Sequence, residues 1–126
     1  MTEYPGNLGH PGMRQAMALR ETGREGVAVN PDHLLLTNGS MQGVTLSAEA
    51  LQENHGDTVL VEEYSYPGTL SAYRNLKLDM VGIPLDEGGM RPDKVEEQLD
   101  RLNKDNRLPK FIYTISTYQN LSLIHI

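Results

Sequence analysis

The sequence predicts an α/β protein whose sheet is largely parallel. Short apolar or β-branched runs alternate along the chain with segments of helical periodicity, and this is the pattern of strands joined by crossover helices. The 126 residues correspond to about one domain. Hydrophobic residues make up 38% and charged residues 22% of the chain, proportions that are typical of a folded domain with a core rather than of a disordered segment.

Helices and strands are predicted from periodicity and from the residues that punctuate it. Segments with helical spacing are 13–24, 41–53, 66–75 and 92–104. The last is amphipathic and has Pro92 near its first position, where the missing N–H costs no hydrogen bond. Predicted strands are 34–37, 58–61, 78–83 and 111–114, and residues 86–89 read as a turn.

The charge and the residue types exclude several classes of function. The net charge is −6 and the basic residues are scattered singly, which argues against nucleic acid or an anionic membrane as the main partner. Cysteine is absent and the four histidines lack the spacing of metal ligands, so we expect no metal site. No run resembles a signal peptide or is long enough to span a bilayer, so a cytoplasmic protein is expected.

Ligands of parallel sheets bind beyond the carboxyl ends of the strands, so the segments that follow strands are candidate sites. The segment 37–43 joins a predicted strand to a predicted helix. A helix N-terminus favours an anion, Gly39 lets a backbone approach closely, and Ser40 can cap the helix or donate to a phosphate oxygen. From this segment alone, an ordinary capped helix start is the more frequent explanation.

Two further segments follow strands. In 62–68 a tyrosine ring can lie against a flat heteroaromatic ligand. The alternative is that one tyrosine packs under the helix and the other is exposed on the surface. Glu62 and Glu63 are adjacent and face opposite sides of a strand, so we expect a solvated strand end rather than an acid/base pair. In 116–120 an asparagine amide can donate to a ring oxygen.

Four segments in this order resemble one known family. They read LLLTNGSMQG, DTVLVEEYSYPGTLSAYR, VGIPLDEGGMRPDKVEEQL and PKFIYTISTYQN. The chain is similar, from about Tyr4 to Asn120, to the pyridoxal-phosphate (PLP) aminotransferases of class I/II and fold type I. The similarity is greatest to the branch that holds 2-aminoadipate and kynurenine aminotransferases and the MocR-type regulators. The resemblance implies PLP-dependent transfer of an amino group between an amino acid and a 2-oxo acid.

The resemblance assigns roles to particular residues. Gly39-Ser40-Met41 match the phosphate-binding turn, with Met41 where glutamine is common. Tyr66 matches the aromatic residue that stacks on the pyridine ring, and Asn120 matches the asparagine that contacts the ring hydroxyl oxygen. Tyr4 is similar to a tyrosine that reaches the phosphate of the neighbouring subunit, which implies a homodimer with shared sites.

The resemblance also implies a division of the chain. Residues 1–30 would form an N-terminal segment and helix, and 31–120 the front part of the PLP-binding large domain. The family continues after the asparagine with Pro-Thr-Gly, whereas 121–126 read LSLIHI, so we expect these six residues not to be native family sequence.

No catalytic residue is assigned. The resemblance implies that the Schiff-base lysine of the family lies beyond residue 126. The four lysines of this chain fall on predicted helices or at strand starts, away from the expected pocket; they are Lys77, Lys94, Lys104 and Lys110. We therefore expect no transamination by the chain alone. Two alternatives stay open: the effector domain of a MocR-type regulator, and another PLP chemistry on the same fold such as that of a β-lyase.

Overall fold

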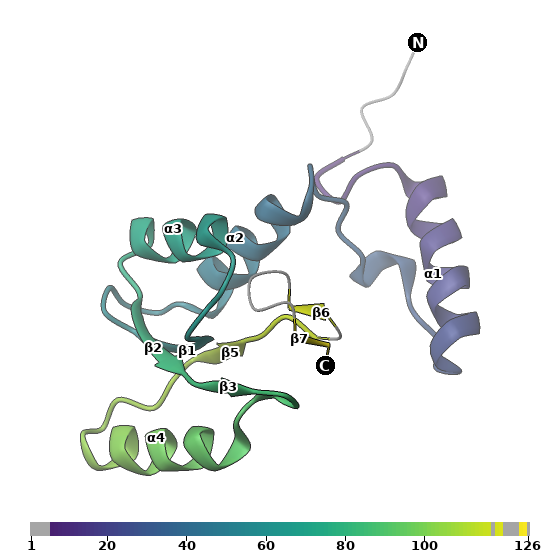
Figure 1. Cartoon of the computed structure of the whole chain (residues 1–126). Helices are drawn as coiled ribbons and strands as arrows, with labels where there is room; N and C mark the ends of the chain where they lie inside the picture. Colours follow the sequence, from purple (N-terminus) through teal and green to yellow (C-terminus); the bar gives the residue numbers. More distant parts are fainter. Residues whose placement is uncertain (1–5, 117, 120–123, 126) are drawn as a thin grey trace. The chain divides into compact units, whose positions relative to one another are not determined.

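The structure, a computed structural model, describes residues 6–116, 118–119 and 124–125. The chain divides into two compact units, which are residues 1–43 and 44–126. Their elements are drawn in Figure 1. No helix among the described residues is long and apolar enough to cross a membrane.

The N-terminal unit is built on helix α1 (Pro11–Glu25). His10 caps its start, because the Nδ1 atom accepts a hydrogen bond from the Met13 N–H at 3.3 Å. The helix ends at Gly26, whose φ of 69° is the left-handed conformation that glycine adopts without strain. The predicted helix 13–24 is confirmed, and it begins two residues earlier because Pro11 suits the first helical position.

The predicted strand 34–37 is wrong. A short 3₁₀ helix, η1 (Pro31–His33), is followed by residues 34–37, which belong to no strand in the described part of the chain. One backbone hydrogen bond, from Leu36 N to Leu8 O at 3.0 Å, ties them to the N-terminal turn. A β-strand requires a ladder of such bonds, and the apolar run alone does not supply a partner.

The C-terminal unit contains a parallel sheet with the order β2-β1-β5. Its strands are β1 (Thr58–Glu62), β2 (Asp79–Ile83) and β5 (Phe111–Tyr113). Val59 pairs with Met80 on one side and with Phe111 on the other, and all five residues of β1 are buried. The predicted parallel sheet is therefore confirmed.

Two antiparallel pairs complete the strands. The predicted turn 86–89 is the connection of a hairpin, in which β3 (Leu85–Asp86) pairs with β4 (Gly89–Met90). Further along the chain, β6 (Tyr118–Gln119) pairs with β7 (Ile124–His125).

Helices cover both faces of the parallel sheet. These are α2 (Ser40–Leu51), α3 (Pro67–Asn75) and α4 (Pro92–Lys104). In the C-terminal unit, α2 and α3 lie on one face and α4 on the other (Figure 1). Alternate residues of β1 point to opposite faces. The first core cluster contains Ala48, Val59, Val61, Tyr73 and Leu78, and the second contains Leu60, Ile83 and Leu102.

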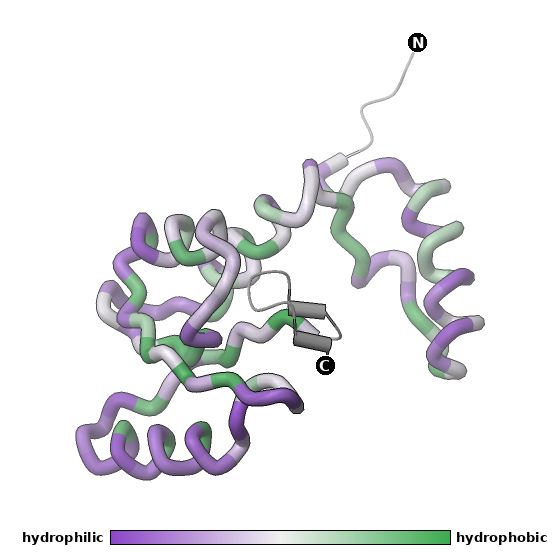
Figure 2. Tube along the Cα trace, viewed as in Figure 1, coloured by the Kyte–Doolittle hydropathy of each residue, from purple (hydrophilic) through white to green (hydrophobic). Residues whose placement is uncertain are grey.

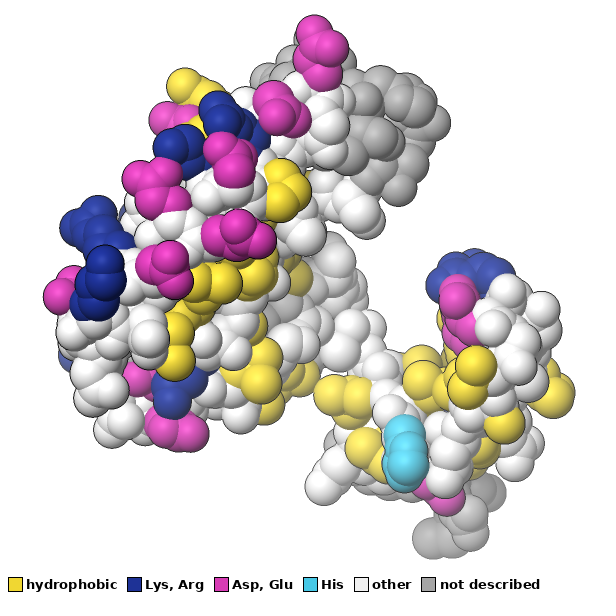
Figure 3. Space-filling view, turned by 90° about the horizontal axis from the view of Figure 1, so that it is seen from below, with side chains coloured by type: hydrophobic (Ala, Val, Ile, Leu, Met, Phe, Trp, Pro, Cys, Tyr) yellow, Lys and Arg dark blue, Asp and Glu magenta, His cyan; other side chains and the backbone are white. Residues whose placement is uncertain are grey.

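The outer surface of α4 is charged. Figure 2 shows hydrophobic colour along the strands and mostly hydrophilic colour along α4. In the space-filling view the face that carries α4 has acidic and basic side chains interspersed (Figure 3). Such a surface is typical of a solvated helix rather than of a basic footprint for nucleic acid.

Candidate functional site

The carboxyl ends of the three parallel strands lie at one edge of the sheet. The strands end at Glu62, Ile83 and Tyr113, and the chain leaves this edge through residues 63–66 after β1 and through 114–116 after β5. This is the edge at which sheets of this type bind ligands. The structure places Tyr66 in the first of these segments.

Glu62 is buried, so the expected solvated strand end is wrong for this residue. Its side chain is only 1% exposed, and its Oε1 atom accepts hydrogen bonds from Thr114 Oγ1 at 2.6 Å and from Ile115 N at 2.8 Å. Buried carboxylates persist in proteins when they are hydrogen-bonded in this way. The signal for this contact is the pairing of β1 with β5, which cannot be read from the two acidic residues alone. Glu63 is exposed, as expected.

The ring of Tyr66 is exposed at the start of α3. Tyr66 is the N-cap residue, with φ −62° and ψ 121°, and its side chain makes no capping hydrogen bond. The ring lies over Gly68, because a Cβ atom added at that glycine would come within 2.5 Å of Tyr66 Cε1. Tyr66 is 52% and Tyr64 61% exposed, so the alternative in which one tyrosine packs under the helix is wrong.

Helix α3 is anchored to β5 by buried side chains. Thr69, which is 1% exposed, donates from Oγ1 to Tyr113 Oη at 3.1 Å. The ring of Tyr73 meets those of Phe111 and Tyr113 edge-on, at centroid distances of 5.6 and 5.8 Å. Burial and the neighbouring Tyr113 raise the pKa of Tyr73 to about 12, so it stays a neutral phenol. These contacts hold in place the helix that carries Tyr66.

Ser65 is a buried polar residue that sequence reasoning missed. It is 3% exposed, and within the described residues its Oγ atom has no hydrogen-bond partner. A buried hydroxyl without a partner is uncommon in native proteins. Its position directly before Tyr66 places it at the same edge of the sheet, but the pattern Tyr-Ser-Tyr carries no signal of burial.

The candidate phosphate turn lies in the N-terminal unit. Gly39 has φ 83°, and Ser40 is exposed and begins α2. A Cβ atom at Gly39 would meet nothing within 4 Å, so this glycine is required for its backbone conformation rather than for space. No acidic residue lies in the first turn of α2, so the positive end of the helix dipole is not neutralised there.

Two side chains shape this turn. Gln42 Oε1 accepts from Asn38 N at 2.5 Å, and Thr37 Oγ1 donates to Gly39 O at 3.1 Å. The role of Gln42 resembles that of the Glu or Gln in a capping box. Its position three residues after Gly39 is the sequence signal from which this role could have been predicted. Ser40, which the sequence offers as a candidate cap, is the first residue of the helix.

The remaining predicted site residues are distributed as follows. Tyr4 and Asn120 lie outside the described residues. The lysines Lys77 and Lys110 lie just before β2 and β5, at the end of the sheet opposite to Tyr66, and Lys110 Nζ donates to Glu53 Oε2 at 2.7 Å. In the described ranges, no group of three or more His, Asp or Glu side chains gathers as metal ligands would.

Comparison with known proteins gives consistent matches. The family model described as aminotransferase class I and II matches residues 1–120. The aromatic-amino-acid aminotransferase 1 of Thermococcus litoralis is 33% identical over 118 residues, which are 94% of this chain and 28% of that protein. The chain therefore spans little more than a quarter of the length of this relative.

Solved structures show the same similarity. The structure of an archaeal alanine:glyoxylate aminotransferase superimposes with a TM-score of 0.83 and 32% identity, over 94% of this chain and 29% of that one. A kynurenine aminotransferase from Pyrococcus horikoshii, solved in complex with PMP, gives a TM-score of 0.82 and 30% identity over the same shares of the two chains.

Proposed function

Because the chain belongs to the aminotransferase class I and II family, we propose that it provides part of the PLP-binding site of an aminotransferase. The reaction is the transfer of an amino group between an amino acid and a 2-oxo acid. The relatives described above are named for aromatic amino acids, kynurenine and alanine with glyoxylate. A homodimer in the cytoplasm, with Tyr4 reaching the phosphate in the neighbouring subunit, belongs to the same proposal.

The exposed ring of Tyr66 is the observation that carries the proposal. It lies at the carboxyl edge of the sheet, half of its surface is open, and Gly68 leaves room for the ring over the start of α3. The pyridine ring of PLP is flat and heteroaromatic, so an aromatic face is a suitable partner for it. Because α3 is anchored to β5, Tyr66 is already held in place before the cofactor binds. Binding therefore does not incur the entropic cost of ordering this residue.

The phosphate of PLP fits the turn Gly39-Ser40-Met41. The positive dipole end of α2, without an acidic side chain in its first turn, favours a phosphate dianion. The exposed Ser40 hydroxyl can donate to a phosphate oxygen. In the same proposal the Asn120 amide donates to the ring hydroxyl oxygen.

The bound cofactor supplies an electron-withdrawing ring that weakens a bond at the α-carbon of the amino acid. The residues of this chain would bind and orient that cofactor: Ser40 would hold its phosphate and Tyr66 would stack on its ring. Lys94 and Lys104 lie on α4, and Lys77 and Lys110 precede strands at the opposite edge. The proposal therefore assigns cofactor binding, and no proton transfer, to the residues named here.

Titration of the chain with pyridoxamine phosphate (PMP) tests the proposal. PMP is the suitable probe because it lacks the aldehyde with which PLP reacts at any exposed lysine. We expect saturable binding, weakened about tenfold by Tyr66→Ala, which corresponds to roughly 1.4 kcal/mol of stacking and buried area. Tyr66→Phe should retain the affinity because the ring remains.

Tyr64→Ala is the matched control, since Tyr64 lies two residues away and is also more than half exposed. Its PMP affinity should equal that of the unchanged chain. An unchanged dissociation constant for Tyr66→Ala, or an equal loss for both alanine variants, would remove Tyr66 from the site. The absence of saturable PMP binding by the unchanged chain would refute the proposal as a whole.

A further inference from the structure

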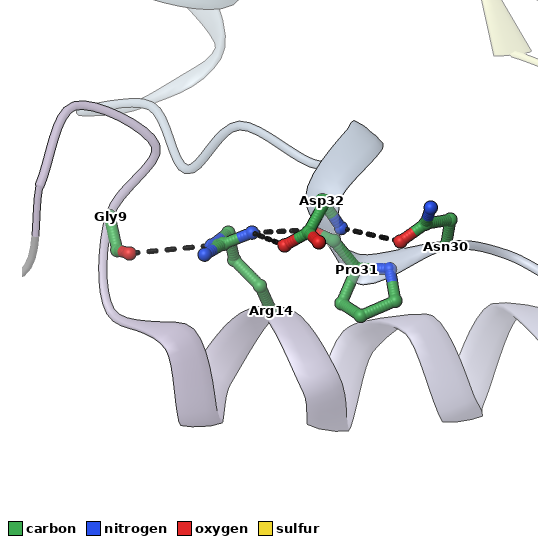
Figure 4. A network of polar contacts seen from close by, with 5 residues as sticks. All are labelled: Gly9, Arg14, Asn30, Pro31 and Asp32. Carbon is green, nitrogen blue, oxygen red and sulfur yellow. Dashed lines mark hydrogen bonds and ion pairs between the residues drawn. The ribbon is translucent and has the colours of Figure 1, made fainter.

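Among the ion pairs of the described residues, Arg14 is the least exposed side chain. Its side chain is only 11% exposed, although it belongs to the surface helix α1. The Nε atom donates to Gly9 O at 3.4 Å, and Nη1 donates to Pro31 O at 2.6 Å and to Asp32 Oδ1 at 3.1 Å (Figure 4). A buried guanidinium is retained only when its donors are paired.

These contacts join two segments that are distant in sequence. Gly9 belongs to the N-terminal turn, and Pro31 and Asp32 belong to η1. We call this arrangement the Arg14 bracket: the guanidinium together with its partners Gly9, Pro31 and Asp32. The ion pair itself contributes little, because the Asp32 side chain is 78% exposed. The two backbone carbonyls therefore account for most of the connection.

The segment 34–37 contacts the N-terminal turn that the bracket holds. Leu36 N donates to Leu8 O at 3.0 Å, and Gly9 lies so close to Leu36 that a Cβ atom there would come within 2.8 Å of Leu36 Cβ. The segment has no strand partner in the described chain, so this contact with the N-terminal turn is what fixes it. The last residue of the segment, Thr37, donates from its Oγ1 atom to Gly39 O at 3.1 Å.

We propose that Arg14 is a positioning residue for the phosphate turn Gly39-Ser40-Met41. It holds the N-terminal turn and η1 together, the N-terminal turn holds Leu36, and Leu36 leads through Thr37 into the first turn of α2. The inference rests on the proposed function, since it names what sets the conformation of the phosphate-binding turn. Lysine does not replace arginine here, because one ammonium group lacks the planar fork that reaches both carbonyls.

Amide hydrogen exchange of the unliganded chain is the first test. Arg14→Lys and Arg14→Ala should accelerate exchange in residues 34–42 at least fivefold while circular dichroism reports unchanged helix content. Arg24→Ala is the matched control: Arg24 lies on the same helix with a side chain that is 62% exposed, and it pairs with Glu21 and Glu25. If the Arg14 variants exchange like the control in 34–42, the inference is overturned.

The second test separates positioning from general stability. Pyridoxamine lacks the phosphate of PMP, so the ratio of the two affinities reports on the phosphate turn alone. We expect both Arg14 variants to reduce that ratio about tenfold, and Arg24→Ala to leave it unchanged. An unchanged ratio would make Arg14 merely structural and overturn the inference. Arg14→Lys carries this test if Arg14→Ala unfolds the unit, because lysine keeps the charge and the apolar stem.

The two proposals fail in different ways. If the unchanged chain binds PMP and pyridoxamine equally well, the phosphate role of Gly39-Ser40-Met41 is refuted, and with it the functional part of the inference. Normal discrimination by the unchanged chain, with no loss in the Arg14 variants, refutes only the role of Arg14. The exchange measurement decides independently whether the bracket holds residues 34–42.

Discussion

Replacement of Glu62 by alanine tests how strongly the buried carboxylate joins β1 to the segment after β5. The substitution removes the acceptor of two hydrogen bonds, from Thr114 Oγ1 and from Ile115 N. Hydrogen bonds to a charged group contribute about 1.5–3 kcal/mol each. Thr114 is exposed and regains water, whereas the Ile115 N–H loses its partner. Part of the loss is offset because the carboxylate no longer has to be desolvated. We expect the free energy of unfolding to fall by about 2–4 kcal/mol.

Glu62→Gln should be less costly. The amide retains an oxygen that can accept both hydrogen bonds, but neutral bonds contribute only about 0.5–1.5 kcal/mol each, so we expect a loss of roughly 1–2 kcal/mol. Glu63→Ala is the control, because Glu63 is exposed on the neighbouring position and surface substitutions stay within about 0.5 kcal/mol.

Urea denaturation of the full chain, followed by circular dichroism, measures these differences. With a slope of about 2 kcal/mol per molar urea, the middle of the usual range, Glu62→Ala should lower the midpoint by roughly 1–2 M. The slope itself should be the same for all variants. The reasoning is refuted if Glu62→Ala unfolds within about 0.5 kcal/mol of the unchanged chain, or if Glu62→Gln is the more damaging substitution.

Three further predictions concern other contacts. Gly68→Ala should weaken PMP binding several-fold with little change in the urea midpoint, since its Cβ atom would come within 2.5 Å of the Tyr66 ring; equal affinity would contradict the described ring position. Thr69→Val should cost about 1 kcal/mol in urea denaturation, because Tyr113 Oη loses a donor; no loss would mean that the bond contributes nothing. Hydrogen bonds from the backbone N–H groups of Asn54 and Glu53 lower the pKa of Asp57. Because the folded pKa is the lower one, this stabilisation is present above about pH 4 and is lost as the pH falls below it. Midpoints of the unchanged chain and Asp57→Asn should therefore converge as the pH falls further below this value, and a constant difference would refute this linkage.

Much of the fold follows from the order of residues because its signals are local. The β-branched run of β1, the amphipathic pattern of α4 and the prolines at helix starts each act over a few residues. They predict the parallel sheet and its helices, and they place Tyr66 in the segment that follows β1. The one strand predicted in error, 34–37, had the right apolar composition but no partner to pair with.

Tertiary structure alone decided the contacts between distant segments. The burial of Glu62 depends on the register that brings β5 beside β1, which places Thr114 and Ile115 within reach of its carboxylate. Arg14 and Pro31 are separated by 17 positions, and nothing in either segment specifies the other. Local propensity and periodicity are encoded within single segments, whereas a hydrogen bond between remote segments exists only after loop closure and packing have brought its donor and acceptor together.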